Sequence, residues 1–139
     1  MILKVKSSFF CKLLLLICLS AIYLNASHLR WMSSYEDARK KAQIQHKNIL
    51  VLLIQKDSAQ INVIIKESFM NQEYIKRLED EFIAVIVRSE GYNSYPIELL
   101  YTQLYPTLFF LSQDELFLLD PLEGVITPSK IIKKLSELD

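Results

Sequence analysis

The pattern of apolar and polar positions after residue 28 predicts an alternation of helices and buried strands. Two uninterrupted apolar runs, Asn48–Ile54 and residues 82–87, are typical of strands covered on both faces. Around them, apolar residues recur at intervals of three and four positions, which indicates helices with one buried face. We expect helices over the following segments: residues 35–45, 59–69, 71–79, 97–104 and 127–138.

Capping residues mark the start of several of these helices. Ser33 followed by Glu36 forms a capping-box signature before the first helix. Asn71 is a residue type that caps helices well. Thr127 followed by Pro128 is a typical opening for the last helix, because proline is tolerated in the first turn.

The segment after Pro106 predicts a change from helices to a hairpin. Residues 107–111 and 115–119 are strand-like and flank a Ser-Gln-Asp turn. The two earlier strands, joined through helices, imply a right-handed parallel crossover, and the hairpin adds antiparallel strands. We therefore expect an α/β three-layer sandwich, with a mixed four-stranded central sheet and helices on both faces.

The N-terminal residues have the pattern of a secretory signal peptide. Lysines precede an apolar stretch without charge, residues 13–24, which is short for a membrane span. Small residues follow it and offer a cleavage site. We expect a signal peptide over residues 1–27, a domain over residues 28–139 and export to a bacterial periplasm. An uncleaved anchor, with the domain facing the periplasm, is the alternative.

Composition and charge narrow the function classes. Apolar residues make up 51% of the chain, which excludes a disordered segment. Sixteen basic residues balance sixteen acidic ones, which argues against a dedicated nucleic-acid binder. The two cysteines, Cys11 and Cys18, both lie in the predicted signal peptide. The exported domain would therefore have no thiol, in a compartment where disulfides can form.

Several short segments occur in an order and at a spacing that resemble one known family. They are Trp31 with Ser-Tyr-Glu-Asp-Ala at 34–38, Asn-Ile-Leu-Val at 48–51, Lys-Glu-Ser-Phe at 66–69, Asn-Gln-Glu-Tyr-Ile at 71–75, Phe-Ile-Ala-Val at 82–85, and Tyr105-Pro106-Thr107 with Leu-Phe-Phe-Leu at 108–111. Together they are similar to the thioredoxin-like superfamily, and in style to periplasmic domains of the disulfide-interchange type. The resemblance implies a thioredoxin-like sandwich with a cis proline at Pro106.

The resemblance is lost at the residues that carry the family's chemistry. Where the family has Cys-x-x-Cys after the first core strand, this chain has Ser58-Ala59-Gln60-Ile61. Many thioredoxins also have a buried acid within that strand, where this chain has Leu52. Disulfide exchange requires a thiolate that attacks a disulfide sulfur, and a serine hydroxyl cannot replace it. We therefore expect no redox activity and no enzyme.

The proline loop is the remaining candidate for a binding site. In the resembled family, the residue before the proline pairs its backbone with a bound peptide strand, which requires no thiol. That residue here is Tyr105, and Tyr92, Tyr95 and Tyr101 are close to it in sequence. The alternative is that Tyr101 and Tyr105 pack along the predicted helix. The predicted binding residues are Tyr105, Pro106, Thr107, Ser58, Ala59, Gln60 and Ile61.

Other chemistry has little support in the residue types present. His28 and His46 are the only imidazoles, and they make neither a zinc spacing nor a base for Ser58. We expect Ser58 to cap the following helix and Trp31 to anchor the N-terminal segment to the domain. Neither a phosphate loop nor a dinucleotide fingerprint occurs. We expect no cofactor and no metal.

Three functional hypotheses follow from these observations. The first is an exported, non-catalytic domain that binds a protein or peptide partner at the former redox face. The second is a thiol-disulfide oxidoreductase, as the resemblance alone would suggest. The third is an accessory subunit of an envelope complex, which would dock through another face, such as residues 35–45 or 130–138. Contact with a membrane would occur only through an uncleaved N-terminal segment, and the oligomeric state stays open.

Overall fold

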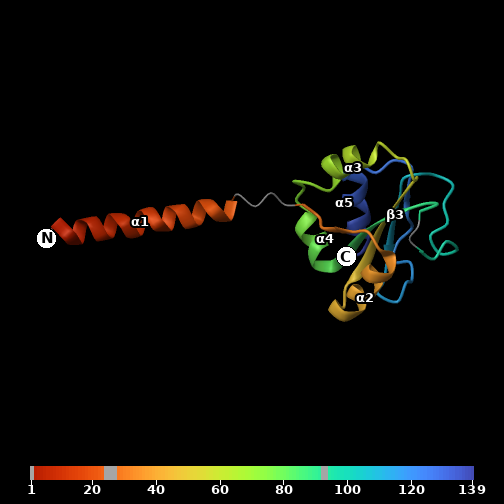
Figure 1. Cartoon of the computed structure of the whole chain (residues 1–139), viewed down its shortest axis with the longest axis horizontal. Coiled ribbons are helices and arrows are strands. Elements are labelled where there is room, and N and C mark those ends of the chain that lie inside the picture. Colours follow the sequence, from red (N-terminus) through yellow and green to blue (C-terminus); the bar gives the residue numbers. More distant parts are fainter. Residues whose placement is uncertain (1, 24–27, 92–93) are drawn as a thin grey trace.

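The computed structural model describes residues 2–23, 28–91 and 94–139. It contains an N-terminal helix, α1 (Ile2–Tyr23), and an α/β body built from the elements that follow (Figure 1). Within the described ranges, no helix combines the length and the hydropathy that a membrane span requires. The predicted cleavage segment at residues 25–27 lies outside the described residues.

A mixed five-stranded sheet forms the centre of the body. Its order is β1-β3-β2-β4-β5. β1 and β2 run parallel to β3, whereas β4 is antiparallel to both β2 and β5. The strands are β1 (Trp31–Met32), β2 (Asn48–Ile54), β3 (Phe82–Arg88), β4 (Thr107–Leu111) and β5 (Leu122–Glu123).

Helices cover both faces of this sheet because successive side chains of a strand point to opposite sides. On one face, α2 (Tyr35–Gln45) packs against Val51 and its neighbours. On the other face, the core around Leu52 includes residues of the three other helices of the body. These are α3 (Ile61–Ser68), α4 (Ile75–Glu81) and α5 (Pro128–Glu137).

Most of the predicted elements are present, and the predicted three-layer α/β architecture is confirmed. The two apolar runs form β2 and β3, and nearly all of their residues are buried. Thr127 caps α5 by accepting a hydrogen bond from the Lys130 N–H. The sheet has five strands rather than four, since the short strand β1 adds to β3. β1 carries Trp31, whose ring meets that of Phe69 edge-on at 4.9 Å, so the anchoring role predicted for Trp31 is confirmed.

Two predicted helix caps are wrong. Ser34, not Ser33, caps α2 by accepting a hydrogen bond from the Asp37 N–H. Asn71 has a φ of 54°, in the left-handed region that asparagine tolerates. It therefore serves the turn after α3, and α4 begins later, at Ile75.

The helix predicted over residues 97–104 is also wrong. A single turn forms, in which the Leu100 N–H donates to the Pro96 carbonyl at 3.0 Å. The Thr102 hydroxyl then accepts from the Leu104 N–H at 3.1 Å. A threonine side chain that bonds to the nearby backbone competes with helix formation, and Pro106 disfavours a helical residue before it.

The predicted hairpin exists in a different form. Residues 115–119 contribute only an isolated bridge between Leu111 and Phe117, and the strand that pairs with β4 is β5. Glu115 has a φ of 62° and accepts a hydrogen bond from the Tyr35 hydroxyl at 2.8 Å. This contact ties the turn to the start of α2, and the Leu118 N–H donates to the Phe110 carbonyl at 2.9 Å before the chain reaches β5.

Tyr74 provides a test of the packing between α3 and α4. Its hydroxyl donates to the Ser68 carbonyl, and burial raises the pKa of this hydroxyl to about 12. Because the pKa in the folded state lies above that in the unfolded state, this contribution to stability is complete below about pH 10 and is lost as the pH rises toward about 12. We expect Tyr74→Phe to lower the free energy of unfolding by about 1 kcal/mol at neutral pH.

The difference in free energy of unfolding between wild type and Tyr74→Phe should shrink as the pH rises from about 10 to about 12, as measured by urea unfolding. Tyr101→Phe, which removes an exposed hydroxyl, is the matched control and should follow the wild-type pH dependence. A difference for Tyr74→Phe that stays constant over this range would contradict the prediction.

Candidate functional site

The sheet register brings the two predicted groups of site residues, 58–61 and 105–107, to one edge of the sheet, which is the edge where β2 ends and β4 begins. β2 and β4 are antiparallel, and Leu53 lies opposite Thr107. The carboxyl end of β2 and the amino end of β4 are therefore neighbours. The loop that follows β2, residues 55–60, and the segment that precedes β4, residues 102–106, both leave the sheet at this edge.

Ser58 does not cap α3, so that prediction is wrong. The N-cap position belongs to Gln60, whose side chain makes no capping hydrogen bond. Ser58 lies in the preceding turn, where its N–H donates to the Gln55 carbonyl at 3.2 Å. Ala59 and Gln60 separate Ser58 from Ile61, the first residue of α3.

The remaining residues that replace the family's motif differ in exposure. Ala59 and Gln60 are exposed, whereas Ile61 is half-buried and packs against the core beneath α3. The two cysteines, Cys11 and Cys18, lie in α1, are exposed and form no disulfide. The edge therefore keeps the apolar packing at Ile61 and carries no thiol at residues 58–61.

The proline loop is held by hydrogen bonds from several directions. The Tyr105–Pro106 peptide bond is cis. The Pro106 carbonyl accepts from the Gly124 N–H at 2.8 Å, which connects the loop to the end of β5. The Thr107 side chain is fully buried; its hydroxyl donates to the Leu104 carbonyl and lies 3.0 Å from the Thr102 hydroxyl. Thr107 thus positions the loop, while Tyr105 is half-buried at its surface.

The tyrosines near the loop do not form one stripe. Tyr95 and Tyr105 pack against the α2 side of the core, and burial raises the pKa of Tyr95. Tyr101 is 66% exposed, and its hydroxyl accepts from the Gln103 side-chain amide at 3.2 Å. Packing along a helix is wrong for Tyr101, because the segment is not helical. Tyr92 lies outside the described residues.

The structure adds exposed apolar residues that the sequence did not identify. Leu104 is 54% exposed and Val125 is 57% exposed. The Cβ position of Gly124 lies 4.0 Å from the Leu104 Cβ, so the backbone just before Val125 lies beside Leu104. The sequence did not identify Leu104 because its segment was predicted to be a helix. Val125 gave no signal because it follows a two-residue strand.

Metal ligands do not gather in the described part of the chain. No group of three or more His, Cys, Asp or Glu side chains there could hold a metal ion. His46 ends α2 with a left-handed φ of 54° and lies just before β2, at the sheet edge opposite Ser58.

Comparison with solved structures identifies a common fold. A structure titled as the DsbH oxidoreductase has a TM-score of 0.56 and 16% identity, over 81% of this chain and 86% of that one. A thioredoxin from Thermus thermophilus has a TM-score of 0.58 and 17% identity, over 80% and 87%. The oxidised DsbD C-terminal domain from Neisseria meningitidis has a TM-score of 0.53 and 14% identity, over 78% and 99%. The chain therefore has a thioredoxin-like fold.

Sequence comparisons identify no relative of this chain. No protein-family model matches the chain, and no curated protein is detectably similar to it.

The lack of thiols at this edge predicts the outcome of an insulin-reduction assay. We expect the full chain to reduce insulin no faster than the uncatalysed reaction with dithiothreitol, because no thiolate occupies residues 58–61. Ser58→Cys/Ile61→Cys is the matched comparison, since it places two thiols where the resembled family has them, and it should exceed the wild-type rate. Turnover by wild type that disappears in Cys11→Ser/Cys18→Ser would contradict the prediction.

Proposed function

We propose that this chain, which has a thioredoxin-like fold, is an exported domain that binds a polypeptide without exchanging disulfides. The observation that carries the proposal is the combination found at one sheet edge. The segment that would hold the thiols contains Ser58-Ala59-Gln60-Ile61, while the loop before β4 stays rigidly supported and is bordered by exposed apolar side chains. Export would follow from the signal-like pattern of residues 1–27.

Tyr105 is the residue best placed to meet a bound peptide. The ladder between β2 and β4 begins at Thr107, so the backbone of Tyr105 precedes the paired region. A peptide could therefore extend the pairing at this loop by backbone hydrogen bonds, with specificity supplied by neighbouring side chains.

The apolar neighbours of Tyr105 would supply the contact area. Leu104, Val125 and Tyr101 are each more than half exposed. Large exposed apolar side chains that gather beside an ordered loop are typical of interaction sites, whereas single ones are ordinary. The Thr102–Thr107 contact and the Gly124–Pro106 hydrogen bond hold the loop in place. The loop would therefore lose little conformational entropy on binding.

Site-specific photocrosslinking tests the proposal directly. A benzoylphenylalanine probe at Gln60 or Tyr101 should give a discrete protein adduct in cells that produce the chain. A probe at Lys133, which is exposed on α5, is the control and should give none. Adducts from Lys133 alone would contradict binding at this edge and would favour an accessory subunit that docks through α5.

A substitution at Leu104 separates binding from folding. Leu104→Asp should remove most of the Gln60 adduct, because it places a charge in the apolar contact area. Since the side chain is largely exposed, the free energy of unfolding should change by no more than about 0.5 kcal/mol. Undiminished crosslinking by a folded Leu104→Asp chain would contradict this contact.

A further inference from the structure

The edge of β3 that faces β1 is only partly paired. β1 pairs with β3 at Ala84 and Val85 alone, whereas β2 pairs with β3 along its whole length. After Met32 the chain leaves the sheet and enters α2. Among the described residues, no strand lies beside positions 86–88 of β3 on this side.

The backbone groups on this edge can be assigned from one hydrogen bond. The Ser89 N–H donates to the Ile54 carbonyl at 2.8 Å, so the backbone groups of Ser89 face β2. Along a strand, the N–H and C=O groups of successive residues point alternately to the two sides. Those of Ile86 and Arg88 therefore point away from β2. The Arg88 carbonyl accepts from the Gly91 N–H in a turn, which leaves the Arg88 N–H and the Ile86 carbonyl directed at the open edge.

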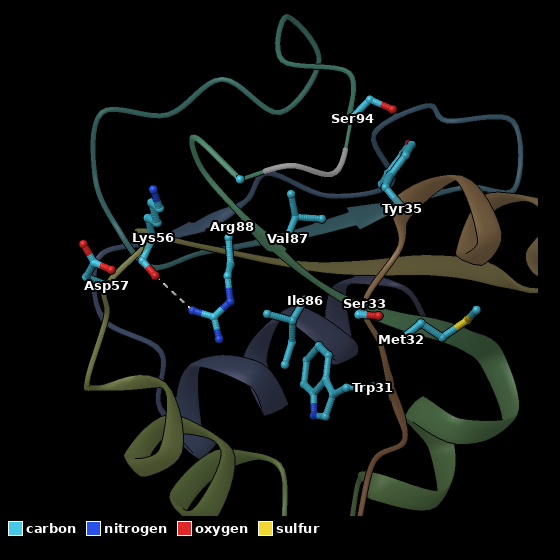
Figure 2. Close-up of a pocket in the computed structure, with 11 residues that line it drawn as sticks. Trp31, Met32, Ser33, Tyr35, Lys56, Asp57, Ile86, Val87, Arg88 and Ser94 are labelled. Atoms are coloured by element: carbon cyan, nitrogen blue, oxygen red, sulfur yellow. Dashed lines mark hydrogen bonds between the residues drawn. The ribbon is translucent and has the colours of Figure 1, made fainter.

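A cavity of about 650 Å³ lies along this open edge (Figure 2). Its lining comes from both faces of the sheet: Trp31 and Ile86 belong to the α3 side, and Met32 and Val87 to the α2 side. A cavity bordered by both faces occupies the position that a longer β1 would fill. Its volume is in the range of pockets that hold small ligands or a few residues of a peptide.

The charges at the cavity favour an acidic occupant. The Arg88 guanidinium donates to the Lys56 carbonyl at 3.2 Å, and Figure 2 shows its side chain extending toward that loop. Within the described ranges, neither Arg88 nor Lys56 forms an ion pair with an acidic side chain. Lys56 and Asp57 also line the cavity, where the Lys56 carbonyl lies on the Arg88 side and its ammonium extends away from the guanidinium (Figure 2). Ile86 and Trp31 supply an apolar wall beside the guanidinium.

We propose that the open edge of β3 binds an extended acidic peptide, which adds two or three residues to the sheet in line with β1. Its backbone pairs with the Ile86 carbonyl and the Arg88 N–H, and a carboxylate of the peptide meets the Arg88 guanidinium. This site is independent of the proline loop, because it lies on the β1 side of the sheet and the loop lies on the β4 side.

The single tryptophan provides a direct measurement, since Trp31 lines the cavity. The probe is a heptapeptide of alternating valine and glutamate, titrated into the full chain while Trp31 emission is recorded. Binding should change the emission in a saturable way. The affinity should fall about tenfold in Arg88→Glu, because attraction becomes repulsion. Lys133→Gln, a charge change on exposed α5, should leave the affinity unchanged.

Two altered peptides separate the backbone contribution from the charge contribution. Methylation of alternate backbone nitrogens should abolish binding, because it removes the donors that a strand needs. Lysine in place of glutamate should also abolish it. If Arg88→Glu fails to fold, as judged by circular dichroism, Lys56→Glu gives the same test from the loop.

The outcomes distinguish this site from the proline loop. No saturable response from the folded wild-type chain at millimolar peptide would overturn the proposal, as would equal binding of the lysine peptide. Binding that is lost in Leu104→Asp but kept in Arg88→Glu would also overturn it, and would place the peptide at the proline loop instead.

Discussion

The central strand β2 is the constraint on which the rest of the structure depends. Residues 49–54 are almost completely buried, because β3 and β4 pair with β2 on its two sides and helices cover its two faces. An apolar strand of this kind cannot lie at a surface without exposing large apolar area to water, so α2 must cover one face and α3, α4 and α5 the other. The directions of β3 and β4 then determine which loops meet at each edge of the sheet.

The edge at the carboxyl end of β2 is where this fold can present functional residues. A parallel neighbour, β3, and an antiparallel neighbour, β4, place three connections there: the loops after β2 and β3 and the segment before β4. In a thioredoxin-like fold with a thiol pair this edge could perform exchange chemistry. In this chain Ile61 keeps the packing that the position requires, while the residues around it supply no nucleophilic sulfur. At this edge, backbone groups, apolar side chains and charges are therefore what could contact a ligand.

Both proposed contacts depend on backbone N–H and C=O groups that the sheet leaves unpaired. On the β4 side, Tyr105 precedes the ladder, and the loop that carries it is fixed by the buried Thr107 and by Gly124. On the β1 side, a strand of two residues ends early and leaves the last part of β3 open. The side chains then distinguish the two regions: exposed apolar residues border the loop, whereas Arg88 and Lys56 border the open edge. They therefore suit ligands of different chemistry.

The sequence alone determined the features that depend on local pattern. Continuous apolar runs indicate β2 and β3, helical spacing with Thr127 and Pro128 indicates α5, and Ser58-Ala59-Gln60-Ile61 has no cysteine where the resembled family has its thiol pair. These conclusions need only residue type, period and spacing.

Tertiary structure decided the features that depend on distant partners. A strand of two residues such as β1 or β5 has no period to recognise and exists only because β3 or β4 lies beside it. Residues 97–104 have a helical apolar spacing, yet Thr102 pairs with Thr107 and the segment forms a loop. Likewise, the Tyr35–Glu115 hydrogen bond joins α2 to the turn after β4 across 80 positions of sequence. The open edge of β3 follows from where β1 ends, and strand pairing between distant segments leaves no local signal in either of them.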